Sequence, residues 1–409
     1  MIVLAAGPCS AILERTMKKA GNWVAIALRP TFLFVAMSSF VVVLLWFVLG
    51  SLVPGLSESE VFQKASSATW RALLDNPLGA PYKLLQFGPQ YFKHQEPWLL
   101  RSASAAVGLL TVCCFYYILN QWYTRRVAIL GTILFVCSAW FLHTARLGTE
   151  SVMYTLLIAV VACTIWLQKS HGHILAVLTG GALLIVLLYI PGMIWFVVPA
   201  LLWQSQRISG LLSRQNPAVL TVLTLLGVVA MAPLGWGLFQ EPSLIRAYFG
   251  LPQVFPAPLD IIKNTFSVPY HVFLRGPHNP ETWLARLPML DWFSVVMFVV
   301  GGYAYYLKRR LDRTVMLVYV GIMGCILIGL GGPVTLAVLL PFIFLVIAGG
   351  LALMLQQWFT VFPHNPVAKT LGACLMTIAV LMSSYYNINH YFIAWPNNPE
   401  TKQVFTHKS

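Results

Sequence analysis

Repeated long apolar runs constrain the fold of this chain more than any other feature. A helix that crosses a bilayer needs about 20 apolar residues, with a range of roughly 17–25. We count eleven runs near this length, three of them short or broken. Charged residues make up only 9% of the chain, whereas a soluble domain has about 25%. The sequence therefore predicts an all-α polytopic membrane protein with about 11 transmembrane helices. The runs are approximately Thr31–Gly50, Ser102–Gln121, Val127–His143, Ser151–Gln168, Ile174–Tyr189, Met193–Trp203, Val219–Phe239, Trp292–Leu307, Val315–Leu330, Val334–Leu355 and Thr370–Tyr386.

The basic residues predict the orientation of these spans. With the N-terminus inside, the inner segments hold 14 of the 26 basic residues and two of the 12 acidic residues. The outer segments then hold 12 basic and 10 acidic residues, which nearly balance. Because basic residues concentrate in cytoplasmic loops, this places the N-terminus in the cytoplasm and the C-terminus outside. The net charge of +14 then reflects topology and anionic lipid rather than a nucleic-acid partner.

Three regions follow from this topology. Residues 1–30 form a cytoplasmic N-terminal segment, residues 31–386 the transmembrane domain, and residues 387–409 a tail at the outer face. Two outer loops, 51–101 and 240–291, are long. Long loops in a compact protein are usually functional, and ten of the 12 carboxylates lie on the outer side. We therefore expect any chemistry at the outer face.

The first outer loop begins with a helix-capping pattern. Ser57 followed by Glu60 predicts a capping box, with the serine at the N-cap and the glutamate at N3. Glu60–Leu74 predicts one amphipathic helix, either lying in the membrane interface or solvated as a loop helix, and ending at the turn Asp75-Asn76-Pro77. A carboxylate at this membrane edge is also placed where a general base could act.

From Pro54 onward, short motifs follow one another in a specific order. They are Pro54-Gly55-Leu56-Ser57-Glu58-Ser59-Glu60, Ala80-Pro81-Tyr82, Phe87-Gly88-Pro89, Leu100–Ala105 with Gly108, and Ala145-Arg146-Leu147 with Glu150. This order resembles the polytopic glycosyltransferases of the GT-C superfamily, in the branch of the protein O-mannosyltransferases and the lipid A aminoarabinose transferases. The likeness covers the first third of the chain in detail; beyond it, the span count and the second outer loop agree.

The resemblance implies a donor in which a sugar is linked to polyprenyl phosphate. The lipid would lie in a membrane groove, with the sugar at the outer face and an acceptor that is not specified. The family keeps a catalytic acid in the first outer loop, commonly the first member of an Asp-Glu pair. Here the corresponding pair is Ser59-Glu60. Either Glu58 or Glu60 has taken the role of base, or the enzyme is inactive.

The chemistry itself asks for a single carboxylate. Polyprenyl phosphate is a good leaving group, and the acceptor hydroxyl needs a base. One carboxylate suffices when inversion occurs in a single displacement. The leaving phosphate then needs cations, for which the outer-face candidates are Lys83, Arg101, Arg146 and Arg275.

Each of these residues also has a structural interpretation. Arg101 at the start of the second span could extend to lipid headgroups. Arg146 and Glu150, spaced i and i+4, could form an ion pair that supports a helix. Glu150 and His278 are the candidate substrate contacts. The segment that carries His278, Tyr248–Asp291, could be an acceptor lid or a packed loop.

Aromatic residues near the last span predict an interfacial belt. This belt would contain Tyr385, Tyr386, His390, Tyr391 and Trp395. We expect His143, at the end of the third span, to be a hydrogen-bonded histidine at the membrane interface rather than a residue that binds a ligand.

The sequence predicts neither a metal site nor another cofactor. It has no Asp-x-Asp pair and no zinc-type spacing, and no glycine-rich loop for a nucleotide. The short inner loops favour a bacterial plasma membrane. Two other functions stay open: a transporter or flippase of lipid-linked glycans, and an inactive accessory subunit. Broken helices at Pro191-Gly192 and at Gly331-Gly332-Pro333 are what a transporter would use for alternating access.

Overall fold

The computed structural model describes residues 30–53, 55–91 and 97–406, without the side chains of residues 30–34 and 89–91. The predicted cytoplasmic segment, residues 1–30, lies almost wholly outside the described residues. The chain divides into two units, residues 1–47 and residues 48–409. The first unit contributes the apolar helix α2 (Pro30–Trp46). The second unit contains all the long loops and the candidate site.

The described residues form helices and no strands, and each predicted span overlaps an apolar helix. Six helical segments are long and apolar enough to cross a membrane, or seven if the bent pair α7–α8 is one span, and four further apolar helices are shorter. The predicted polytopic all-α fold is therefore confirmed, and the count of eleven spans stays a prediction. Beyond α2, the corresponding elements are α6 (Pro97–Trp122), α7 (Arg125–Cys137) with α8 (Ala139–Arg146), η1 (Glu150–Leu156) with α9 (Leu157–Lys169), α10 (Ile174–Leu188), α11 (Ile194–Trp203), α13 (Pro217–Gln240), α16 (Trp292–Leu307), α17 (Asp312–Gly329), η2 (Leu336–Val338) with α18 (Leu340–Val361), and α19 (Pro366–Asn389).

The first long loop is helical but not one helix. It contains α3 (Glu58–Ser66), α4 (Trp70–Asp75) and α5 (Ala80–Tyr91). The predicted single helix breaks because the Ser67 hydroxyl donates back to the Gln63 carbonyl at 2.9 Å, and such bonds compete with the helix. Thr69 then caps α4 by accepting from the Ala72 N–H at 3.2 Å. The predicted end at Asp75-Asn76 is correct.

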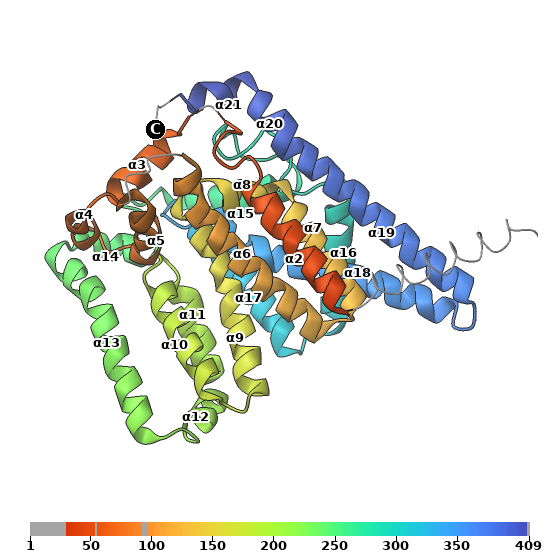
Figure 1. Ribbon diagram of the computed structural model, residues 1–409, viewed down its shortest axis with the longest axis horizontal. Helices are drawn as coiled ribbons and strands as arrows, with labels where there is room; N and C mark the ends of the chain where they lie inside the picture. Colours follow the sequence, from red (N-terminus) through yellow and green to blue (C-terminus); the bar gives the residue numbers. More distant parts are fainter. Residues whose placement is uncertain (1–29, 54, 92–96, 407–409) are drawn as a thin grey trace, which may run out of the picture. The chain divides into compact units, whose positions relative to one another are not determined.

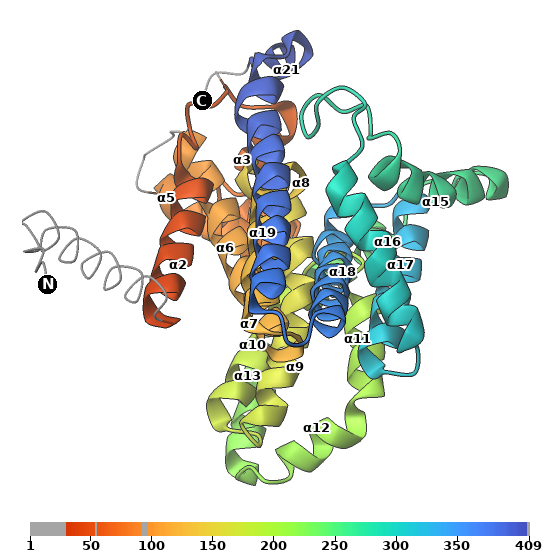
Figure 2. The same ribbon diagram turned by 90° about the vertical axis from the view of Figure 1, so that its right-hand side faces the viewer.

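The second long loop is also mostly helical. It holds α14 (Ser243–Tyr248) and α15 (Pro258–Phe273), followed by an irregular segment, residues 274–291. In Figure 2, α21 (Pro399–Val404) and the green loop after α15 lie at the end of the second unit away from α12 (Ser205–Leu212). Figure 1 shows α3 and α21 at the same end. The two long loops and the end of the chain therefore meet there.

The two predicted helix breaks pack against each other. The Gly192 N–H donates to the Tyr248 carbonyl at 2.8 Å. A Cβ added to Gly250 would lie 2.9 Å from Gly192 Cα, and one added to Gly332 would lie 2.1 Å from the Gly250 carbonyl oxygen. Glycine is needed here because backbones approach closely and because Gly192 and Gly250 have φ of +74° and +73°. This packed junction gives the breaks a structural role.

The described part of the predicted tail, residues 387–406, is mostly helical. α19 runs three residues past the predicted span end at Tyr386 to Asn389, and is followed by the π-helical turn η3 (His390–Ala394), then α20 (Trp395–Asn397) and α21. Tyr391 and Trp395 are each only 3% exposed, so their predicted place in an aromatic belt is wrong. Tyr385 and Tyr386, at 73% and 51% exposed, do fit such a belt.

Candidate active site

Glu60 is the centre of the site, and the predicted capping box positions it. Ser57 precedes α3 in an extended conformation, and its hydroxyl accepts from the Glu60 N–H at 3.2 Å. The Glu60 carboxylate accepts from the Ser57 N–H at 3.2 Å. This reciprocal pair satisfies two N–H groups that the helix leaves open. It fixes the first turn of α3 and buries the Glu60 side chain completely, with 0% exposed.

Arg101 holds the same carboxylate from α6. Its Nε and Nη2 donate to Glu60 Oε1 and Oε2 at 2.8 Å and 2.9 Å, which is a bidentate ion pair. The Gly148 N–H adds a bond to Oε1 at 2.9 Å. Arg101 also donates to the carbonyls of Gly55 at 2.8 Å and Leu49 at 3.3 Å. Because this guanidinium is 2% exposed, it does not extend to lipid headgroups.

Arg146 reaches the site from the end of α8. Its guanidinium lies 4.5 Å from the ring centroid of Phe392 and 5.2 Å from that of Tyr391, in cation–π geometry. Glu150 does not pair with it: the ion pairs in which both partners are described residues are Arg101–Glu60 and Arg207–Asp312. The predicted i, i+4 pair is wrong because α8 ends at Arg146 and the chain is extended at Leu147.

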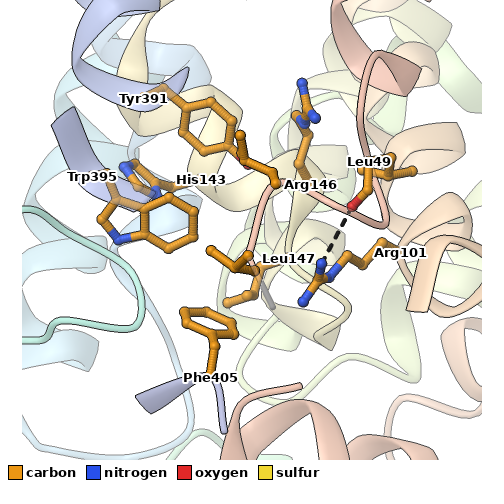
Figure 3. A pocket seen from close by; sticks show the side chains of 10 residues that line it. Leu49, Arg101, His143, Arg146, Leu147, Tyr391, Trp395 and Phe405 are labelled. Carbon is orange, nitrogen blue, oxygen red and sulfur yellow. Dashed lines mark hydrogen bonds between the residues drawn. The ribbon is translucent and has the colours of Figure 1, made fainter. Parts of the chain in front are cut away.

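Arg101 and Arg146 line one small pocket, shown in Figure 3. His143 stands on its wall, with its ring centroid 4.7 Å from those of Tyr391 and Trp395. The Nε2 atom of His143 finds no hydrogen-bond partner among the described residues, so the predicted satisfied histidine is not seen. The lining contains two guanidinium groups and no carboxylate, which suits an anion. The lining residues are Leu49, Leu52, Val53, Arg101, His143, Arg146, Leu147, Tyr391, Trp395 and Phe405.

Lys83 belongs to a second cluster, between α5 and η1. Its ammonium donates to the Asn76 carbonyl at 2.8 Å and is 3% exposed as a residue. Burial lowers the pKa of Lys83, and the negative charge of Glu150 opposes that shift. Glu150 lies against Gly79, where an added Cβ would be 2.3 Å from its Oε2. The structure therefore brings Lys83 and Glu150 together, apart from the lining of the arginine pocket.

Three predicted site residues are exposed. Glu58 lies in the first turn of α3, and Arg275 and His278 lie in the irregular segment after α15. None of the three lines the arginine pocket. A residue that the sequence did not single out, Glu281, accepts from the hydroxyls of Ser57 at 2.6 Å and of Ser59.

These features define a polytopic membrane protein with a buried carboxylate in its first long loop and an arginine-lined pocket beside it. The sequence matches no protein-family model and no curated protein. Solved structures of ArnT from Cupriavidus metallidurans are among those similar to this chain. The structure in the apo state has 14% identity and a TM-score of 0.55, and the match covers 95% of this chain and 78% of that one. The structure bound to undecaprenyl phosphate has 13% identity and a TM-score of 0.53, and the match covers 92% of this chain and 77% of that one. At this identity the likeness shows the fold alone, which is that of ArnT.

Proposed function

We propose that this chain is a membrane glycosyltransferase that moves a sugar from a polyprenyl-phosphate carrier to an acceptor at the outer face of a bacterial plasma membrane. The observation that carries the proposal is the pocket that Arg101 and Arg146 line next to the carboxylate of Glu60. The fold supports it, because a protein of this fold has been solved with undecaprenyl phosphate bound. The proposed topology has the N-terminus in the cytoplasm and the C-terminus outside.

The arginine pocket suits the leaving group of this reaction. When the bond between the sugar and the phosphate breaks, negative charge develops on the phosphate, and fixed cations stabilise it most in a site that excludes water. Arg101 donates four of its five N–H groups, two to Glu60 and two to backbone carbonyls. One N–H on Nη1 is therefore left to bind a ligand. We propose that this N–H and the Arg146 guanidinium face the phosphate, with Lys83 and Arg275 as further candidates.

The base is a carboxylate of the outer loops. Glu60 has four donors on its two oxygens, which fills its acceptor sites. While it keeps those bonds it holds α3 in place rather than taking a proton. Of the two candidates in the first loop, Glu58 is therefore the one with a free carboxylate. Glu150 and His278 are the proposed substrate contacts.

The transporter alternative has less support. Its main sequence argument is the pair of broken helices, and these breaks pack tightly through Gly192, Gly250 and Gly332. The charged residues of the site also lie where the predicted outer loops meet, rather than along a path through the spans. An inactive accessory subunit would keep the same fold, so only an activity assay separates it from an enzyme.

The test is turnover by the purified protein in nanodiscs. Undecaprenyl phosphates that carry different sugars, including aminoarabinose and mannose, would be supplied with an extract of the bacterial envelope as acceptor. We expect mass spectrometry to detect free undecaprenyl phosphate with at least one of these donors. If the wild-type protein releases none from any donor, the proposed enzyme function is wrong.

A further inference from the structure

Glu281, in the second outer loop, is hydrogen-bonded to two serines of the first outer loop. Its Oε1 accepts from the Ser57 hydroxyl at 2.6 Å and from the Ser59 hydroxyl. The two hydroxyls are themselves 3.3 Å apart. Its other oxygen, Oε2, accepts no hydrogen bond from the residues that the structure describes. The serines thus orient the carboxylate by one oxygen and leave the second oxygen open.

The residues on both sides of Glu281 are fixed to the wall of the arginine pocket. The carbonyl of Pro280 accepts from Trp395 Nε1 at 3.0 Å. The ring centroid of Trp283 lies 5.2 Å from that of His143. Both Trp395 and His143 line the pocket. A short turn between these anchors therefore presents Glu281 beside the pocket, half-buried rather than in open solvent.

The carboxylates of this region differ in what they can do. Glu60 is fully buried, and four donors occupy its oxygens. Glu58 is exposed, and no partner orients its carboxylate among the described residues. Glu281 is both oriented and open at one oxygen. A general base needs this combination, because the proton must be within hydrogen-bond reach of a lone pair that is held in place.

We infer that Glu281, rather than a carboxylate of the first loop, is the general base of the reaction; this inference rests on the proposed function. Glu281 Oε2 takes the proton of the acceptor hydroxyl. The acceptor oxygen forms a bond to the anomeric carbon as the bond between that carbon and the phosphate oxygen breaks. The electron pair of the broken bond leaves on polyprenyl phosphate, beside Arg101 and Arg146. The proton on Glu281 then passes to water.

The experiment removes the carboxylate at position 281 and places a new one at position 59, whose hydroxyl donates to Glu281 in the wild type. Glu281→Gln removes the base, and we expect release of undecaprenyl phosphate to fall by about 10²–10⁴-fold. Adding Ser59→Asp to that variant returns a carboxylate to within hydrogen-bond distance of the lost one, and we expect it to recover at least about tenfold. Glu241→Gln, an exposed glutamate of the same loop, is the matched control and should behave as wild type.

A second variant separates catalysis from positioning. Glu281→Ala opens a space at the carboxylate, and we expect added formate to restore part of the rate, since a small carboxylate can supply the missing base. Native mass spectrometry would measure the affinity for undecaprenyl phosphate without a sugar. We expect Glu281→Gln and Glu281→Ala to bind this lipid as tightly as wild type. The assignment would be wrong if Glu281→Gln kept a rate like that of Glu241→Gln. It would also be wrong if the Glu281 variants bound the lipid more weakly and neither Ser59→Asp nor formate restored activity. A wild-type protein that turns over no donor would instead refute the proposed function.

Discussion

The buried pair of Glu60 and Arg101 gives the sharpest prediction for stability. In Glu60→Gln the amide keeps one acceptor oxygen and gains an NH₂ group. Whichever way the amide turns, that group faces two N–H donors, because each carboxylate oxygen accepts two bonds. Each unsatisfied buried donor costs about 1–3 kcal/mol, and the guanidinium of Arg101 loses its counter-charge. Removing one partner of a buried pair costs about 3–5 kcal/mol, and we expect a loss of this size.

The chain contains a matched exposed pair. Arg207 and Asp312 lie 3.1 Å apart with side chains 59% and 52% exposed. Water screens such a pair, so Asp312→Asn should cost about 0–1 kcal/mol. The free energy of unfolding of both variants would be measured by equilibrium denaturation with dodecyl sulfate in mixed micelles. If Glu60→Gln lowers the free energy of unfolding no more than Asp312→Asn does, then the Glu60 carboxylate is not buried with four hydrogen-bond donors on its oxygens.

Three further predictions follow. Arg146→Gln should weaken binding of undecaprenyl phosphate about tenfold or more through loss of a charge-assisted bond, as native mass spectrometry would show; unchanged affinity would remove Arg146 from the phosphate site. Burial lowers the pKa of Lys83, so its positive charge should be lost at a lower pH than that of an exposed lysine, and the contribution of Lys83 to lipid affinity should be lost with it. Arginine stays charged, so Lys83→Arg should extend lipid binding to higher pH. A titration in which this variant and wild type lose affinity at the same pH would contradict the prediction. Gly332→Ala, whose Cβ would lie 2.1 Å from the Gly250 carbonyl oxygen, should cost about 1–3 kcal/mol in the same denaturation assay, whereas Gly180→Ala, with no atom within 4 Å, should cost nothing.

Features that depend on local sequence could be predicted well. Each apolar run contains an apolar helix, because a chain in a bilayer must satisfy its backbone internally. The capping box of Ser57 and Glu60 is a contact over three residues, so the spacing alone identifies it. The order of short motifs predicted a fold like that of the lipid-linked sugar transferases, and the chain has the fold of the solved structure of ArnT.

Contacts between distant segments could not be predicted in this way. Glu281 lies 224 residues from Ser57, and no pattern in either loop indicates the other. The spacing of Arg146 and Glu150 misled because it assumes a continuous helix, and the extended residue Leu147 breaks it. Tyr391 fits a membrane belt by composition, but a helical turn places it over Arg146.

Following the sugar itself distinguishes a transferase from a transporter most directly. Proteoliposomes would receive an undecaprenyl-phosphate donor labelled in the sugar, together with the envelope extract. A transferase breaks the bond between sugar and phosphate, so we expect one free undecaprenyl phosphate for each labelled sugar that appears on an acceptor. A transporter would leave the donor intact and change only the leaflet in which it lies. Label that changes leaflet while remaining on the lipid would contradict the proposed transferase function.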